Sequence, residues 1–283
     1  MRLLLLVLFV ALSGCAMTIS ENNIVIPRPG EAIASGRSPD GIWSIDALSI
    51  QAAPGVILRG AAFRKTNSVG TVLYFGGNGF VLSQHYSHVL RIYQDIPVDV
   101  VAFDHRGYAG SNGTASLNKL MGDGVLIYDS VLATPELLAK PLIVHGHSMG
   151  SFIAGNVARN RALDGLVLES SATSTEQWAQ DFVDHSIWLR KATVDPALAG
   201  KGNSGVMSTL DEPLLIVVGK DDTTTRPAMS EALFEGAAVS VASKELLIVK
   251  GAGHMNAARN AVYGEAFLRL LNRAEAAVGE VTL

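Results

Sequence analysis

Short apolar runs alternate with longer amphipathic stretches along most of the chain. The runs predict β-strands at 42–50, 56–63, 71–75, 98–103, 141–145, 166–168, 213–218 and 246–249, the first two forming a hairpin. The stretches predict helices at 84–96, 117–138, 148–161, 226–234 and 257–276. This alternation predicts an α/β fold with a mostly parallel sheet covered by helices on both faces. A functional site is then expected in loops beyond the carboxyl ends of the strands.

Two segments fall outside this alternation. Residues 171–212 lack an apolar strand pattern, which predicts a small, partly helical cap insertion above the sheet edge, with a plain connecting helix as the alternative. Residues 15–40 are polar and rich in proline and glycine, which predicts a tether rather than core. Residues 41–283 are therefore expected to form one domain.

The first residues have the pattern of a targeting segment. Arg2 precedes the apolar run 3–12, which is about half the roughly 20 residues needed to cross a bilayer. Residues 1–14 are therefore predicted to be a signal peptide. The sequence Leu-Ser-Gly before Cys15 resembles the lipobox of bacterial lipoproteins. The resemblance implies a lipid anchor on Cys15 in the bacterial envelope, and Ala16 implies the outer membrane in a diderm host. The alternative is an ordinary secretory signal with an incidental cysteine.

Composition narrows the classes of protein. Of 283 residues, 48% are hydrophobic and 17% charged, which suits a well-buried α/β core and argues against disorder. The net charge of -4 comes without a basic run, so no nucleic-acid partner is expected. One cysteine excludes an intramolecular disulfide, and the histidines lack a metal-ligand spacing such as HExxH. No cofactor is expected.

A candidate nucleophile lies between a predicted strand and a predicted helix. Residues 146–150 read Gly-His-Ser-Met-Gly, a GxSxG pattern centred on Ser148. The pattern alone is weak, but a strand before it and a helix after it are what a nucleophile elbow requires. Side chains at Gly146 or Gly150 would crowd the sharp turn or the neighbouring strand. The N-terminus of the following helix favours negative charge at the reacting centre.

A serine hydroxyl needs an adjacent base. His185 and His254 are the histidines that follow Ser148 in the chain. His254 lies in a glycine-rich loop after a predicted strand, which favours it, whereas His185 lies in the insertion. Asp221 and Asp222 follow the strand at 213–218, and either carboxylate would orient the histidine and stabilise its cation.

The loop Gly76-Gly77-Asn78-Gly79-Phe80 follows the strand at 71–75, and its glycines let backbone N–H groups approach a substrate oxygen. An oxyanion hole is expected from the N–H of Met149 and one from this loop. Asn78 is preferred and Gly79 is the alternative. A tight turn without a catalytic role is the competing interpretation.

Together these residues resemble the α/β-hydrolase superfamily over nearly all of residues 50–276, in particular a small-cap branch of acyl hydrolases and thioesterases. The loop 103–111, which contains Asp104 and Arg106, and the segment 168–170 are similar to that branch. The resemblance selects Asp222 over Asp221 and implies that Asp104 and Arg106 brace their loop. The chain departs from the branch at position 76, where histidine is usual, and at Ala109, where glycine is usual.

The resemblance implies a serine hydrolase that cleaves carboxylic esters or thioesters of a small-molecule or lipid-like acyl substrate. Peptidase or acyltransferase chemistry on the same three residues is one alternative. A non-catalytic envelope lipoprotein on a hydrolase scaffold is another, although a scaffold would not need all of Ser148, Asp222 and His254. Phe80, Trp178, Phe182 and Trp188 are candidates for an acyl pocket or for core packing.

Overall fold

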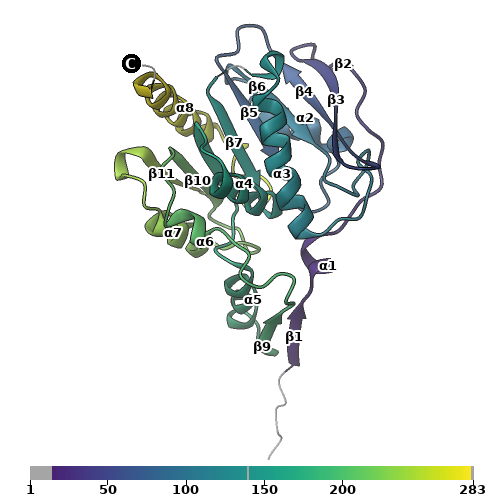
Figure 1. Cartoon of the computed structure of the whole chain (residues 1–283). Helices are drawn as coiled ribbons and strands as arrows, with labels where there is room; N and C mark the ends of the chain where they lie inside the picture. The colour runs from purple at the N-terminus through teal and green to yellow at the C-terminus, as the bar shows by residue number, and fades with distance from the viewer. Residues whose placement is uncertain (1–14, 139, 282–283) are drawn as a thin grey trace, which may run out of the picture.

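A computed structural model describes residues 15–138 and 140–281 (Figure 1). The predicted signal peptide, residues 1–14, lies outside the described residues. Among the described residues, no helix combines the length and apolar character that a bilayer-spanning helix needs.

The central layer is a nine-stranded sheet within the described residues, in the order β11-β10-β8-β7-β5-β6-β4-β3-β2. Its strands are β2 (Gly36–Arg37), β3 (Ser44–Ala53), β4 (Val56–Arg64), β5 (Gly70–Phe75), β6 (Val98–Phe103), β7 (Leu142–His147), β8 (Gly165–Glu169), β10 (Leu214–Gly219) and β11 (Lys244–Val249). The neighbouring strands β11, β10, β8, β7, β5 and β6 pair in parallel. Strands β4, β3 and β2 are added beyond β6 by antiparallel pairing. The predicted hairpin and the mostly parallel sheet are both confirmed.

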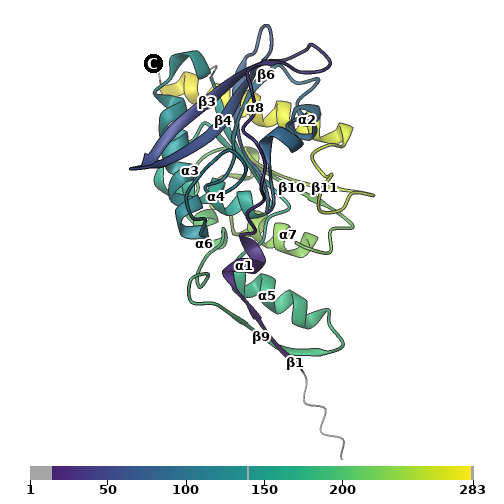
Figure 2. The same cartoon turned by 90° about the vertical axis from the view of Figure 1, so that its right-hand side faces the viewer.

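Helices cover both faces of the sheet (Figures 1 and 2). They are α1 (Glu21–Ile24), α2 (Leu82–Ile92), α3 (Leu117–Leu132), α4 (Met149–Asn160), α5 (Thr175–Asp184), α6 (Ser204–Met207), α7 (Pro227–Gly236) and α8 (Ala261–Val281), with short 3₁₀ turns at Pro135–Leu137 and Val241–Ser243. One hydrophobic core lies beneath α3, α4 and α7, and a second beneath α2 and α8. Strand β5 serves both, since Leu73 and Phe75 join the first core and Val72 and Tyr74 the second.

The segment 15–40, expected to be a tether outside the core, instead packs along the domain. Strand β1 (Cys15–Ile19) pairs in parallel with β9 (Leu189–Val194). Ile19, Ile24 and Val25 are buried in the core beneath α3 and α4. The backbone N–H of Ile26 also donates to the side chain of Asn78. These apolar and hydrogen-bonding contacts fix residues 15–26, whereas most side chains of 27–37 are exposed.

The predicted cap insertion contains α5 and α6, but the expectation that 171–212 lacks a strand is wrong because β9 lies within it. The sequence of β9, Leu-Arg-Lys-Ala-Thr-Val, has no continuous apolar run. It becomes a strand by pairing with β1, which comes from the far N-terminal part of the chain.

Replacing Gly150 by alanine is expected to destabilise the fold. An ideal Cβ at Gly150 would lie 2.1 Å from the backbone oxygen of Phe75, so α4 or β5 must shift. Such overpacking costs about 1–3 kcal/mol of unfolding free energy. Gly122 in α3 is the matched control because a Cβ there meets nothing within 4 Å, and Gly122→Ala should stabilise by about 1 kcal/mol. Urea unfolding of both variants measures this; an undiminished stability of Gly150→Ala would contradict it.

Candidate active site

Ser148 occupies a sharp turn between β7 and α4. Its backbone has φ of 53° and ψ of -121°, a conformation that costs a non-glycine residue about 1–3 kcal/mol. The turn is held because the N–H of Ser148 donates to the backbone oxygen of Glu169 at 2.9 Å. A Cβ on Gly146 would lie 2.4 Å from the oxygen of Gly150. Because the φ of Ser148 is positive, α4 begins at Met149 and not at Ser148 as predicted.

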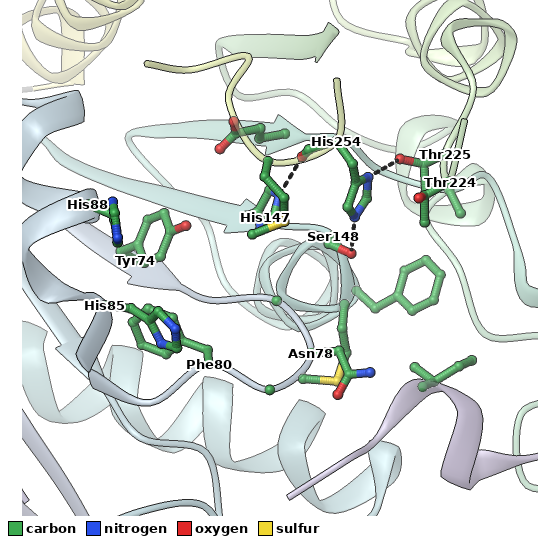
Figure 3. Close-up of a pocket in the computed structure, with 18 of the residues that line it drawn as sticks. Tyr74, Asn78, Phe80, His85, His88, His147, Ser148, Thr224, Thr225 and His254 are labelled. Atoms are coloured by element: carbon green, nitrogen blue, oxygen red, sulfur yellow. Dashed lines mark hydrogen bonds between the residues drawn. The ribbon is translucent and has the colours of Figure 1, made fainter. Parts of the chain in front are cut away.

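Side chains from three loops meet at this turn (Figure 3). His254 Nε2 lies 2.9 Å from Ser148 Oγ, and His254 Nδ1 lies 2.9 Å from Asp222 Oδ2. His254 follows β11 and Asp222 follows β10, so both come from the carboxyl edge of the sheet. The arrangement lets the imidazole take the hydroxyl proton while the carboxylate orients it.

Asp222 is the aspartate that contacts the histidine, whereas its neighbour Asp221 is exposed. The N–H groups of Thr224 and Thr225 donate to Asp222 Oδ1 at 2.8 and 2.9 Å. Burial alone would raise the pKa of Asp222, but the hydrogen bond and charge of His254 and these N–H groups lower it to about 2. Asp222 is therefore a carboxylate at neutral pH.

Residues not identified from the sequence also position the histidine. The hydroxyl of Thr225 lies 2.9 Å from Asp222 Oδ2, 2.9 Å from the Ser170 backbone oxygen and 3.2 Å from His254 Nδ1, and its one proton can be donated to either oxygen. His147 Nε2 donates to the backbone oxygen of His254 at 2.9 Å, and burial lowers the pKa of His147. His147 is the first variable residue of the GxSxG pattern, and this pattern is the sequence signal that could have drawn attention to it.

A buried carboxylate beneath the turn joins the loops that carry Ser148 and His254. Glu169 Oε1 accepts the N–H of Ala258 at 2.9 Å, while its backbone oxygen holds Ser148. Its Oε2 lies 3.3 Å from Nε2 of the buried His145. Burial of Glu169 opposes ionisation, but the contacts with His145 and Ala258 outweigh it and lower the pKa. The three contacts fix the end of β8 against both loops.

The loop after β5 lies against Ser148, as an oxyanion loop requires. A Cβ on Gly77 would lie only 3.2 Å from Ser148 Cβ, so glycine allows this close approach. Asn78 and Met149 line the same pocket as Ser148. The Asn78 side chain faces away to accept the N–H of Ile26 at 3.0 Å, which leaves its backbone as the candidate donor. The assignment of the two N–H donors stays a prediction.

The departure at position 76 has a steric explanation. A Cβ on Gly76 would lie 2.2 Å from the ring of Phe80, so the Phe80 ring occupies the space that a side chain at 76 would need. The oxygen of Gly76 accepts a hydrogen bond from His105 Nε2 at 2.9 Å. The loop therefore keeps its place without a histidine at this position.

A cavity of about 490 Å³ opens above Ser148. Its apolar lining includes Ile24, Phe80, Val89, Ile92, Met149, Phe152 and Trp178. In Figure 3, Tyr74, Phe80, His85 and His88 lie on one side of Ser148 and the α1 ribbon on the other. Of the other aromatic candidates, Phe182 packs against Trp178 and Trp188 is exposed. His185 bonds to Asp181 in the cap and does not line the cavity.

Asp104 and Arg106 brace their loop, as the resemblance implied. Asp104 Oδ1 accepts the N–H of Leu82 at 2.7 Å, and Oδ2 accepts that of Gly110 at 3.3 Å. Arg106 Nε donates to Asp123 Oδ2 at 2.8 Å. Neither residue lines the cavity above Ser148.

Asp104 should make stability depend on pH. Burial raises the pKa of Asp104 from 3.8 to about 6, despite the two N–H groups that lower it. Between these values the folded chain keeps a proton that the unfolded chain has lost. Stability contributed by Asp104 therefore falls by about 3 kcal/mol as pH rises through this window of roughly two units, at about 1.4 kcal/mol per pH unit, and is lost at neutral pH. Urea unfolding of wild type and Asp104→Asn across this range measures the effect as a difference; a pH-independent difference would contradict it.

The fold and this site define a serine hydrolase of the α/β-hydrolase class. The chain belongs to the family described as serine aminopeptidase, S33, whose model matches residues 66–209. Among solved structures it is similar to an esterase of Pyrococcus furiosus, with 16% identity, a TM-score of 0.65 and coverage of 88% of this chain and 99% of that one. It is also similar to acetyl xylan esterase 1 of Thermoanaerobacterium, with 15% identity, a TM-score of 0.62 and coverage of 87% and 88%.

Two curated relatives extend the comparison. Lysophosphatidylserine lipase ABHD12 of Danio rerio is 25% identical over 183 residues, which are 60% of this chain and 47% of the relative. The chain thus spans about half the length of that protein. The uncharacterized protein YfhR of Escherichia coli is 24% identical over 223 residues, 76% of this chain and 75% of the relative.

Proposed function

We propose that this protein hydrolyses carboxylic esters or thioesters through an acyl-enzyme on Ser148. The observation that carries the proposal is the hydrogen-bonded series Ser148–His254–Asp222, with both distances 2.9 Å, at the floor of a largely apolar cavity. Such a cavity suits an acyl chain better than a polar substrate.

In the proposed mechanism, Ser148 Oγ bonds to the substrate carbonyl carbon as its proton passes to His254 Nε2. The N–H groups of Met149 and Asn78 bind the oxyanion; each such donor is worth about 2.7–4 kcal/mol in other serine hydrolases. The carbon–oxygen or carbon–sulfur bond then breaks, and the leaving group takes the proton from His254. Water, deprotonated by His254, releases the acid and restores Ser148.

Peptidase chemistry is the second candidate because the family description names an aminopeptidase. An aminopeptidase needs an acidic group to receive the substrate's α-ammonium. Among the described residues that line the cavity, Glu169 is the acidic one, and its oxygens already contact Ala258 and His145. The absence of a second carboxylate there favours an ester or thioester substrate.

A substrate panel tests the proposal. The purified protein is assayed on p-nitrophenyl esters and acyl thioesters of increasing chain length, on aminoacyl p-nitroanilides, and on lysophospholipids because the name of ABHD12 includes such a substrate. Ester or thioester turnover well above that of the anilides is expected, with a preference that varies with chain length. Faster turnover of the anilides would reverse the assignment.

We also propose that Cys15 carries a lipid anchor in a bacterial envelope, as the lipobox resemblance implies. The support is positional: Cys15 begins β1 and pairs with Leu189 of β9. Cells grown with an alkynyl fatty acid should incorporate the label into wild type and lose it in Cys15→Ser. Equal labelling of wild type and Cys15→Ser would contradict a lipid anchor on Cys15.

A further inference from the structure

The strand pair β1–β9 forms an end of the molecule. Cys15 pairs with Leu189 at one end of the pair and Ile19 with Val194 at the other. In both views the pair lies with α5 at the end of the molecule opposite the C-terminus of α8 (Figures 1 and 2). The turn that leads into β9 is therefore at the tip, beside the start of β1.

Two adjacent large apolar side chains project from this tip. Ile187 is 74% exposed and Trp188 is 71% exposed. The turn itself is ordered, because Ser186 Oγ accepts the N–H groups of Trp188 at 3.1 Å and Leu189 at 3.0 Å. Trp188 is also the only aromatic residue among the exposed large hydrophobic side chains of the described residues. An ordered backbone thus holds a tryptophan and an isoleucine in solvent.

Basic side chains continue directly from the apolar pair. Arg190 and Lys191 are exposed in β9, and neither takes part in an ion pair within the described part of the chain. The exposed carboxylate nearby in sequence, Asp184, accepts a hydrogen bond from Gln180. The tip therefore combines an indole, an aliphatic side chain and two unpaired cations.

We propose that this tip docks on a lipid bilayer with anionic headgroups. Tryptophan favours the interfacial region of a bilayer, and each arginine or lysine near an anionic surface adds about 1 kcal/mol of attraction. The chain itself points to a bilayer rather than a protein partner, because the candidate lipidation site Cys15 pairs with Leu189, next to Trp188. An anchor at Cys15 would bring Trp188 to the headgroups.

Two walls of the cavity lie on the segments that lead to this tip. Strand β1 leads through Ser20 into α1, where Asn23 and Ile24 line the cavity. The turn at the tip follows α5, where Trp178 lines the cavity from the cap. The cap-side walls are thus continuous with the docking tip. The benefit to catalysis rests on the proposed function, and the choice of a bilayer over a protein partner rests on the lipid anchor proposed at Cys15.

The test uses tryptophan fluorescence of the full chain. Wild type and Trp188→Phe are mixed with vesicles of phosphatidylcholine, with and without phosphatidylglycerol, and the difference spectrum isolates Trp188 from Trp43 and Trp178. We expect a blue shift with phosphatidylglycerol and quenching of Trp188 by brominated acyl chains. The double variant Arg190→Gln/Lys191→Gln should bind phosphatidylglycerol vesicles with an affinity lowered by about fivefold for each residue replaced. If acrylamide in the water still quenches Trp188 fluorescence on vesicle-bound protein, the proposal is overturned. It is also overturned if light scattering shows a dimer that buries Trp188.

Activity separates this proposal from the proposed function. Ile187→Ser/Trp188→Ser should hydrolyse a vesicle-embedded acyl ester about tenfold more slowly or worse, with unchanged hydrolysis of soluble p-nitrophenyl acetate. Val241→Ser is the matched control, because Val241 is 79% exposed and belongs to the 3₁₀ turn before β11. Ser148→Ala should do the opposite, losing both activities while keeping the Trp188 shift. Equal vesicle activity of the double variant and wild type would refute the docking role.

Discussion

Ser148→Ala is expected to lower ester hydrolysis by about 10³- to 10⁶-fold, the largest effect of any single substitution in this chain. The hydroxyl at 2.9 Å from His254 Nε2 is the atom that would form the acyl-enzyme, and alanine removes it without adding volume. The remaining activity would come from water activated by His254 and from the oxyanion-binding N–H groups. Initial rates on a p-nitrophenyl ester, with a fluorophosphonate probe to report covalent labelling, measure the loss.

The control for this substitution is Ser87→Ala, which removes an exposed hydroxyl from α2 outside the cavity lining. It should keep both full turnover and probe labelling. Urea unfolding should show that Ser148→Ala is folded; relief of the strained turn is not expected, because alanine meets the same backbone restriction at φ of 53°. A Ser148→Ala protein that still turns over esters at the wild-type rate would end the proposed mechanism.

The regular part of the fold could be predicted because its signals are local. The sequence predicts β6 at its observed bounds, Val98–Phe103, because this run is apolar except for Asp99 and ends at Asp104. GxSxG placed Ser148 because both the preceding strand and the following helix are visible in the sequence. The positive φ of Ser148 explains the difference in where α4 begins, since no residue in that conformation continues a helix.

What the sequence could not show depends on distant partners. Strand β9 is polar at three of its six positions, two of them adjacent, and it pairs with β1 through residues such as Met17 and Ala192. The tether interpretation is wrong for residues 15–26 for the same reason, since Ile24 gains its burial from a core assembled by other segments. The contacts of Thr225 and Glu169 likewise arise where separate loops meet, so no periodicity or spacing marks them.

Asp222→Asn is expected to lower kcat by about 10⁴-fold, as removal of the equivalent charge does in serine proteases. The carboxylate at 2.9 Å accepts the Nδ1–H of His254, which leaves Nε2 unprotonated and facing Ser148. An asparagine amide can donate to Nδ1 instead and so favour the tautomer with a proton on Nε2. That tautomer cannot accept the serine proton. Steady-state kinetics on the preferred ester measure the effect.

Asp221→Asn is the matched control, because it makes the same chemical change one residue away on an exposed side chain. It should retain nearly full activity, which would separate the two aspartates that the sequence left adjacent. Asparagine at 222 can still accept the N–H groups of Thr224 and Thr225, so Asp222→Asn should remain folded by circular dichroism. A large loss in Asp221→Asn with little in Asp222→Asn would reverse the assignment, because an exposed carboxylate would then have to reach His254 through a rearranged loop.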